Sequence, residues 1–169
     1  MIDSYRPSPF RQYRIRPWQP EDRQAAGAVI AAVLAEYGLG WDPQGSDRDA
    51  LEVETHYWQT DGEFWVIEDD DTLVGTAGYY PIQRGDQAVE IRKMYLQSTA
   101  RGQGLGRHLL NQLEEAIQRR GFEQIWVETA SVLKEAVQLY ETSGYLPVEE
   151  VETARCDRAY YKRLSSPSP

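Results

Sequence analysis

One short stretch constrains this chain more than any other: Arg-Gly-Gln-Gly-Leu-Gly-Arg at residues 101–107. A strand-like segment over residues 88–96 precedes it, and apolar side chains at helical spacing follow it as far as Gly121. Three alternating glycines leave backbone N–H groups uncovered, and the start of a helix adds unpaired donors and the positive end of its dipole. The stretch therefore predicts a strand, an anion-binding loop and an amphipathic helix, in that order.

The charge around this loop differs from that of the rest of the chain. Residues 84–120 hold seven basic and four acidic side chains, although the whole chain has a net charge of −9. A basic island in an acidic chain fits a local anion site, but chance clustering along a solvated helix explains it equally well. The overall acidity disfavours nucleic acid as a partner.

Two well-known phosphate-binding motifs do not match the loop. A dinucleotide-binding G-x-G-x-x-G would need glycine where Arg107 stands, and a P-loop would need a Gly-Lys pair, which the chain lacks. Two explanations are left. One is a cradle for a pyrophosphate, to which Arg101 and Arg107 add positive charge, and the other is a turn that only lets the helix pack closely. The spacing favours the cradle.

Hydrophobic periodicity and turn residues divide the chain into strands and helices. Helices are predicted over residues 20–34, from 105 to near 121 and from 133 to 144, with a weaker one at 46–58. Strands are predicted at residues 13–16, 64–67, 73–80, 88–96, 123–128, 145–148 and 159–164. The second and third of these strands form a hairpin. This order predicts a mixed α/β layer fold with a largely antiparallel sheet.

The length of 169 residues predicts one domain. We place it at residues 11–164, between a flexible arm at 1–10, which has two prolines and no periodicity, and a flexible tail at 165–169. The lone cysteine, Cys156, excludes an internal disulfide and a cysteine metal cluster, so we expect no metal.

Several negative features together predict a cytoplasmic location. The chain has no run of eighteen apolar residues, so no segment is expected to span a membrane. Residues 1–7 lack the apolar stretch of a secretion signal. A chain with a single cysteine also fits a reducing compartment.

Three separate segments carry a family resemblance. Residues 101–106, Arg-Gly-Gln-Gly-Leu-Gly, are similar to the Q/R-x-x-G-x-G/A signature of the GNAT superfamily of N-acetyltransferases. Residues 90–96 resemble the strand before that signature, and residues 136–145 resemble the later helix of the family. The opening at residues 15–22 is also similar, so the resemblance covers about residues 13–164. It implies a GNAT-like fold, with a central, mostly antiparallel sheet that splays between two strands and is flanked by helices.

The resemblance implies acetyl-CoA as the acyl donor. The pantetheine arm of the donor would pair with backbone groups of Met94, Tyr95 and Leu96, where the strand splays from its parallel neighbour. The alternative is that this strand belongs only to the core. The pyrophosphate would lie on the loop, so the resemblance assigns these residues to donor binding: Arg101, Gly102, Gln103, Gly104, Leu105, Gly106 and Arg107.

Two residues are candidates for proton transfer. Glu90 is the candidate general base, acting through a water; the alternative is an ion pair with Arg92 on the same face, and Glu128 is a weaker rival. Tyr140 is the candidate general acid toward the departing thiolate, and its alternative is packing on the apolar face of a helix. A backbone N–H on the splayed strand, that of Tyr95, is the candidate oxyanion donor.

One position departs from the family pattern. Many relatives carry asparagine three residues before the helix alanine, where this chain has Leu133, and Ser131 or Thr129 is the nearest polar substitute. The two histidines form no metal pattern. His56 is expected in packed core or in the wall of the acceptor pocket, and His108 on a solvated helix face near the phosphates.

The resemblance implies transfer of an acetyl group to a primary amine of a small-molecule or peptide acceptor. Two alternatives stand beside this interpretation: a non-catalytic module that binds acyl-CoA, and an interaction domain that binds no nucleotide. The acidity of the chain outside the loop region favours a cationic small molecule as the acceptor. Relatives are often dimers, so a homodimer is also expected.

Overall fold

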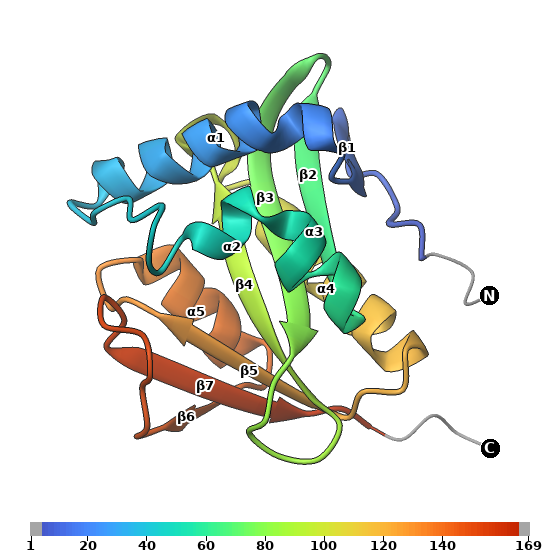
Figure 1. The fold of residues 1–169 in the computed structure, drawn as a ribbon, viewed down its shortest axis with the longest axis vertical. Helices are drawn as coiled ribbons and strands as arrows, with labels where there is room; N and C mark the ends of the chain where they lie inside the picture. Colours follow the sequence, from blue (N-terminus) through green and yellow to red (C-terminus); the bar gives the residue numbers. More distant parts are fainter. Residues whose placement is uncertain (1–4, 166–169) are drawn as a thin grey trace.

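The computed structural model describes residues 5–165. Its centre is a seven-stranded sheet in the order β1-β2-β3-β4-β5-β7-β6, with helices on both faces (Figure 1). Neighbouring strands are antiparallel except β4 and β5, so the predicted mixed fold with a mostly antiparallel sheet is confirmed. The strands are β1 (Tyr13–Pro17), β2 (Glu63–Asp69), β3 (Thr72–Pro81), β4 (Ala88–Leu96), β5 (Gln124–Thr129), β6 (Leu146–Val148) and β7 (Arg158–Arg163).

The helices match the predictions except in one segment. The weaker helix expected at residues 46–58 is two short helices, because the backbone of Glu52 (φ −113°, ψ 52°) leaves the helical region between them. Short 3-10 turns lie at Pro20–Asp22, Trp58–Thr60 and Ser98–Ala100. The helices are α1 (Arg23–Glu36), α2 (Arg48–Leu51), α3 (Val53–His56), α4 (Leu105–Arg119) and α5 (Lys134–Thr142). Within residues 5–165, no helix is long and apolar enough to cross a bilayer.

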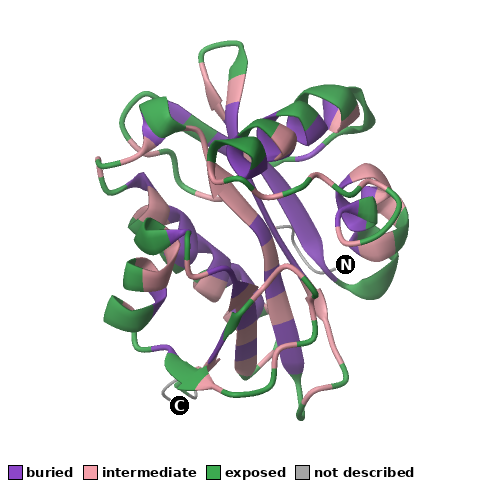
Figure 2. Ribbon diagram, turned by 90° about the vertical axis from the view of Figure 1, so that its left-hand side faces the viewer, coloured by how far each residue is buried: buried purple, intermediate pink, exposed green. Residues whose placement is uncertain are grey.

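Two apolar clusters pack on the two faces of the sheet, and buried and partly exposed positions alternate along its strands (Figure 2). On β2, Trp65 and Ile67 belong to the cluster under α4, whereas Phe64 and Val66 belong to the cluster under α1, α2 and α3. This is the two-residue period of a strand that is buried on both sides. The predicted apolar face of α4 is fully buried: Leu105, Leu109, Leu110, Leu113 and Ile117.

The sheet opens between β4 and β5. Their parallel pairing covers only Ala88–Ile91 against Gln124–Val127, although β4 continues to Leu96. A bulge sits in the unpaired part: Lys93 has a positive φ of 53°, and the Thr76 hydroxyl donates to the Lys93 carbonyl at 2.6 Å. The predicted splay is therefore confirmed, and it leaves backbone groups of β4 free on the β5 side.

The predicted arm and tail extend past the described chain, because residues 1–4 and 166–169 lie outside it. Residues 5–10, in the segment where a flexible arm was predicted, make contacts with the rest of the fold. The Tyr5 hydroxyl lies 2.8 Å from an oxygen of Gln112 on α4, and the Tyr5 ring stacks on Trp65 with centroids 5.9 Å apart. At the other terminus the Ser165 carbonyl accepts a hydrogen bond from Gln118. Aromatic rings in this short segment pack on the rest of the fold, an interaction that its proline content does not predict.

Candidate functional site

A cavity of about 400 Å³ opens where β4 and β5 part. Its lining comes from β4, the glycine loop, the end of β5, α5, the end of α1 and the connection between β6 and β7. We call Met94–Leu96 with residues 101–107 the loop end of this cleft. Arg92, Lys93 and Arg155 also line the cavity, and we call these three, with their ion-pair partners Asp47 and Asp49, its ion-pair end.

The loop end presents backbone donors. Gly102 and Gly104 have positive φ values of 75° and 92°, and Gly104 is the residue before α4 begins. Within the described chain, none of the backbone N–H groups from Gly102 to Arg107 donates a hydrogen bond to a protein acceptor. Free N–H groups at a helix N-terminus form a site that attracts anions.

The two arginines of the loop have different roles. The Arg101 side chain donates to the Leu96 carbonyl at 2.8 Å and pairs with Glu36, so it braces the start of the loop. Arg107 is exposed and donates to the hydroxyl of Thr142 at 2.9 Å. Of the two, Arg107 is the one that no carboxylate neutralises among the described residues. It is therefore the better placed to add charge to a bound anion.

The predicted donor residues do not all face the cavity. Gln103 turns its amide to the Tyr13 hydroxyl at 3.0 Å, and the Leu105 side chain is buried in the core. Neither residue lines the cavity. The others line the cleft as expected: Met94, Tyr95, Leu96, Arg101, Gly102, Gly104, Gly106 and Arg107.

Tyr140, on α5, lies beside Met94 of the loop end. It is almost fully buried and lines the cavity, and within residues 5–165 its hydroxyl has the Met94 sulfur at 3.8 Å as its one partner, which is a weak one. Burial, with smaller contributions from Tyr95 and Cys156, raises the pKa of Tyr140 well above its ordinary value. Its ring also packs edge-on against Tyr145 at 5.6 Å. Tyr140 thus packs in the core and also keeps a phenol proton. The two interpretations from the sequence, a packing residue and a general acid, are therefore compatible.

Glu90 lines the cleft near the parallel pairing of β4 and β5. Arg92 donates to it at 3.0 Å, which is the ion pair that the sequence offered as an alternative to catalysis. Burial is the largest influence on the pKa of Glu90 and raises it, Arg92 opposes that rise, and the net shift is upward. The carboxylate is therefore paired but still more basic than an exposed glutamate.

The rival carboxylate, Glu128, is already occupied. It accepts hydrogen bonds from the backbone N–H groups of Glu152 and Thr153 at 2.7 and 2.8 Å, and from Arg84 at 3.0 Å. Burial alone would raise the pKa of Glu128, but these donors outweigh burial and the pKa is lowered. Glu128 therefore anchors the connection between β6 and β7 and is a poor base.

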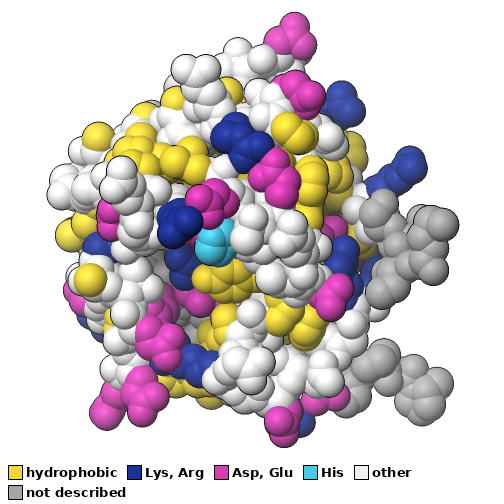
Figure 3. All heavy atoms as spheres, viewed as in Figure 1, with side chains coloured by type: hydrophobic (Ala, Val, Ile, Leu, Met, Phe, Trp, Pro, Cys, Tyr) yellow, Lys and Arg dark blue, Asp and Glu magenta, His cyan; other side chains and the backbone are white. Residues whose placement is uncertain are grey.

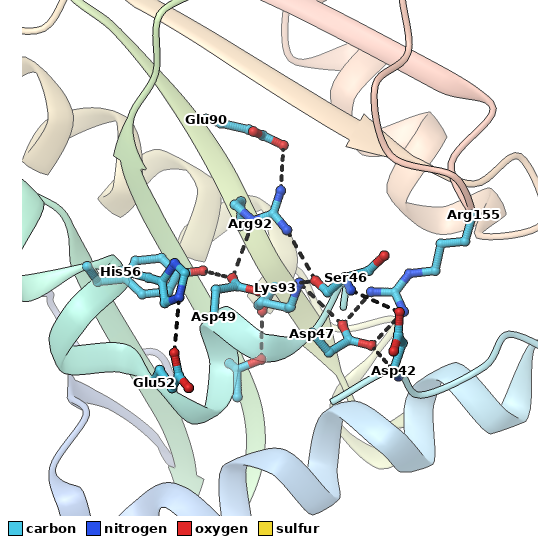
Figure 4. Close-up of polar contacts among 12 residues, drawn as sticks. Asp42, Ser46, Asp47, Asp49, Glu52, His56, Glu90, Arg92, Lys93 and Arg155 are labelled. Carbon is cyan, nitrogen blue, oxygen red and sulfur yellow. Dashed lines mark hydrogen bonds and ion pairs between the residues drawn. The ribbon is translucent and has the colours of Figure 1, made fainter. Parts of the chain in front are cut away.

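The ion-pair end joins three parts of the chain (Figure 4). The Lys93 ammonium lies 3.3 Å from a carboxylate oxygen of Asp47 and 3.1 Å from one of Asp49, and it donates to the Ser46 carbonyl at 2.9 Å. Arg92 reaches Asp49 at 3.3 Å. Burial opposes ionisation of Asp49, but Lys93 and Arg92 outweigh it, so the pKa of Asp49 is lowered and the carboxylate is charged at neutral pH.

Arg155 completes this cluster from the connection between β6 and β7. It forms a two-pronged ion pair with Asp47, whose side chain is fully buried, and donates to the Gly40 carbonyl at 3.0 Å. Figure 4 shows Arg155 reaching from that connection to the segment before α2. Sequence analysis did not identify Asp47, Asp49, Lys93 or Arg155 as site residues.

The remaining sequence candidates have structural partners. Thr129 and Leu133 line the cleft, whereas the Ser131 hydroxyl donates to Asp157 at 2.6 Å and does not line it. His56 lies 3.4 Å from Glu52 on the surface of α3. His108 contacts the Ser8 carbonyl at 2.8 Å and the Phe10 ring at 5.1 Å between centroids.

Comparisons with known proteins agree with this geometry. Residues 14–145 match the family model described as the acetyltransferase (GNAT) family. The uncharacterized N-acetyltransferase YjgM of Escherichia coli (strain K12) is 34% identical over 128 residues, which cover 74% of this chain and 77% of that relative. N-acetyltransferase 8F1 of Rattus norvegicus is 24% identical over 100 residues, and the match spans 57% of this chain and 45% of that longer relative.

Solved structures share the fold. A GNAT-family acetyltransferase of Staphylococcus aureus Mu50 superposes with a TM-score of 0.83 over 90% of this chain and 99% of that chain, at 18% identity. The yncA protein of Salmonella typhimurium, solved with its cofactor acetyl-CoA, has a TM-score of 0.69 over 92% of this chain and 95% of that chain, at 19% identity. At such identities the likeness concerns the fold alone.

Proposed function

Because this chain belongs to the acetyltransferase (GNAT) family, we propose that it transfers an acetyl group from acetyl-CoA to a primary amine of a small-molecule or peptide acceptor. The observation that carries the proposal is one continuous cleft. It leads from the free N–H groups of the glycine loop, along the unpaired part of β4, to the Tyr140 hydroxyl. These features suit, in order, a pyrophosphate, an amide-bearing arm and a thioester.

Acetyl-CoA would be held mainly by backbone groups. The N–H groups of residues 102–107 suit the pyrophosphate, and Arg107 adds the positive charge that no carboxylate neutralises among the described residues. Met94, Tyr95 and Leu96 would pair with the pantetheine arm, since β4 has lost its β5 partner there. The donor supplies the activated acetyl group as a thioester, and the Tyr95 N–H is our candidate for the oxyanion.

Tyr140 is proposed as the general acid. When the amine has attacked and the thiolate leaves, the phenol would donate its proton to the sulfur. Burial raises the pKa of Tyr140, so the phenol is protonated throughout the neutral range and the proton is available. The phenol has only the Met94 sulfur as a partner among the described residues, so little is lost when it turns toward the donor.

Glu90 is proposed as the general base, acting through a water. An amine acceptor arrives mostly as an ammonium ion, so a carboxylate whose pKa is raised by burial helps to remove its proton. The ion pair with Arg92 holds the carboxylate in place. Glu128 is a weaker candidate, because three donors already occupy its oxygens and lower its pKa.

The acceptor is proposed to be a cationic small-molecule amine. On the face that carries α1, α2 and α3, acidic and basic side chains alternate, with acidic ones gathered toward the lower left (Figure 3). Exposed Glu149, Glu150 and Glu152 belong to the connection that also brings Thr153 and Cys156 to the cleft. An acidic rim would raise the local concentration of a cation. From the sequence alone we also propose a cytoplasmic location, a homodimer and a single domain over residues 11–164.

The proposal is tested by release of coenzyme A. Purified protein and acetyl-CoA are mixed with a panel of polyamines, aminoglycosides, amino acids and peptides, and free thiol is followed with time. Release that depends on one class of amine supports the proposal and identifies the acceptor class. Binding of acetyl-CoA without release by any amine would favour a non-catalytic acyl-CoA-binding module. Absence of binding would favour an interaction domain.

A further inference from the structure

We propose that residues 5–10 brace the glycine loop from behind, and that Phe10 is a positioning residue for the nucleotide part of the donor. The inference rests on the proposed function, since the ligand it concerns is acetyl-CoA. It also concerns a segment that sequence analysis assigned to a flexible arm.

The segment is fixed to α4 by polar contacts. The Tyr5 hydroxyl lies 2.8 Å from oxygens of both Gln112 and Glu115, and the Ser8 N–H donates to the same Gln112 oxygen at 2.7 Å. Gln112 is almost fully buried, so it is a well-fixed acceptor. Further along, the Ser8 carbonyl lies 2.8 Å from the His108 ring nitrogen. These contacts place residues 5–8 along the first three turns of α4.

Phe10 follows and reaches the loop itself. A Cβ atom built on Gly104 would lie 3.5 Å from the tip of the Phe10 ring, so this ring faces the side of the loop that glycine leaves open. The ring also packs on His108 in the first turn of α4. Gly104 lines the cleft, whereas Phe10 does not, so Phe10 meets the loop from outside the cavity.

A tight turn sets the position of Phe10. The Phe10 N–H donates to the Tyr13 carbonyl at 3.0 Å and the Tyr13 N–H donates back at 2.8 Å, while Arg11 adopts a positive φ of 53°. The Tyr13 hydroxyl accepts from the Gln103 amide at 3.0 Å. Phe10 and Tyr13 therefore hold adjacent residues of the loop, and both are tied to the start of β1.

The loop needs such support for a physical reason. Gly102, Gly104 and Gly106 give it wide conformational freedom, and none has a side chain with which to pack. Arg101 anchors the start of the loop at the Leu96 carbonyl, and α4 anchors its end. Between those points, its supports among the described residues are Phe10 and the Gln103 side chain, which donates to the Tyr13 hydroxyl and to the Thr99 carbonyl. Without Phe10, the loop would be ordered only when acetyl-CoA binds. The conformational entropy lost in that ordering would reduce the affinity for acetyl-CoA.

The test compares two donors that differ in the part the loop would hold. Acetyl-CoA carries the pyrophosphate and nucleotide, whereas S-acetyl-pantetheine lacks them and uses only the β4 side of the cleft. Dissociation constants are measured by calorimetry for acetyl-CoA, and by competition for the weaker fragment, with the full-length chain. In Phe10→Ala we expect acetyl-CoA to bind about tenfold more weakly, and the fragment to bind within about twofold of the wild type.

Two further variants guard against a trivial explanation. Phe10→Leu keeps most of the apolar contact and should recover most of the acetyl-CoA affinity. Trp58→Ala removes a half-exposed ring that packs on Trp18, far from the loop in sequence, and should leave both constants unchanged. Thermal unfolding of every variant reports whether the fold is kept. Where Phe10→Ala does not fold, Phe10→Val carries the test, because valine stays apolar but lacks the ring tip that faces Gly104, and it should weaken acetyl-CoA but not the fragment.

The outcomes separate this inference from the proposed function. Equal weakening of both ligands would mean general damage and would overturn the brace, as would wild-type affinity for acetyl-CoA in Phe10→Ala. A wild-type chain that binds neither ligand would overturn the proposed function and the brace with it. Selective weakening for acetyl-CoA alone supports both.

Discussion

The loop end of the cleft comes from one continuous stretch, residues 94–107, whereas the ion-pair end joins residues 47–49, residues 92–93 and Arg155. At the loop end the backbone provides the chemistry, through free N–H groups at positions 102–107. At the ion-pair end side chains provide it, and the fully buried Asp47 is held by two cations.

This difference affects what each end tolerates. Backbone N–H donors depend on the conformation of the loop and not on its side chains. They therefore require glycines that can adopt that conformation and neighbouring residues that hold the loop in place. A buried ion-pair cluster needs all its members, because removing one leaves the charges of the others unpaired in a medium of low polarity. We therefore expect substitutions at the loop end to reduce donor binding, and substitutions at the ion-pair end to reduce stability first.

The largest effect is expected from Asp47→Ala. The substitution leaves Lys93 and Arg155 without their shared buried carboxylate. The free energy of unfolding should fall by about 3 to 5 kcal/mol, measured by urea denaturation. The control is Arg48→Ala, whose ion pair with Glu52 is 59% and 42% exposed, and which should cost no more than about 1 kcal/mol. Similar losses in the two variants would show that the ion-pair end is not a stability element.

Tyr140→Phe tests the proposed general acid, which lies beside the loop end. Turnover with an accepted amine should fall about a hundredfold or more, while affinity for acetyl-CoA changes little, because only the proton donor is removed. Tyr145→Phe is the matched control: its ring packs on Tyr140, but its hydroxyl donates to Glu114 at 3.1 Å. Steady-state rates of both variants give the answer. A Tyr140→Phe rate equal to that of the wild type would remove Tyr140 from the mechanism.

Gly104→Val tests the loop end, with Gly121→Val as its partner. The two glycines flank α4 and have nearly equal positive φ values, 92° and 90°, so valine strains both by about 1 to 3 kcal/mol. A Cβ atom at position 104 points toward the Phe10 ring, so the side chain of valine would press on that ring as well as strain the loop. Acetyl-CoA affinity should fall about tenfold in Gly104→Val alone. Equal affinities in the two variants would contradict the site.

The smallest expected effect concerns the acid limb of the pH–rate profile, which Glu90 would produce. A general base works only when ionised, so activity should be present above the pKa of Glu90 and should decline as pH falls through it. Burial raises that pKa above the ordinary 4.5, so the decline begins at a higher pH than for an exposed glutamate. Glu90→Gln should abolish this limb and lower the plateau, whereas Glu128→Gln should retain it. A limb retained in Glu90→Gln would assign the base elsewhere.

The loop end of the cleft is more predictable from the sequence than the ion-pair end, because it comes from one continuous stretch. The strand at residues 88–96 and the loop after it carry local signals, namely apolar alternation, alternating glycines and helical spacing, and the structure has these elements at those positions. The sheet order, with β7 between β5 and β6, has no local signal because it depends on pairing between distant strands.

The ion-pair end was not predictable for a related reason. Lys93 adopts a positive φ at a bulge, which brings it to Asp47 and Asp49, and an alternating pattern would not anticipate that direction. Asp47 and Arg155 are 108 positions apart and meet only when the sheet is assembled. In the segment at 46–58, a single helix was expected from a weak, partly apolar pattern, and Glu52 interrupts it.

The measurement that tests the loop end most directly is thermal unfolding with and without acetyl-CoA, since it requires no knowledge of the acceptor. At about a hundred times its dissociation constant, the donor should add roughly 2.7 kcal/mol to the stability of the folded chain. For a domain of this size that corresponds to a rise in the midpoint of about 5 to 10 °C. No rise at millimolar acetyl-CoA would mean that the glycine loop is only structural, and the proposed donor site would be wrong.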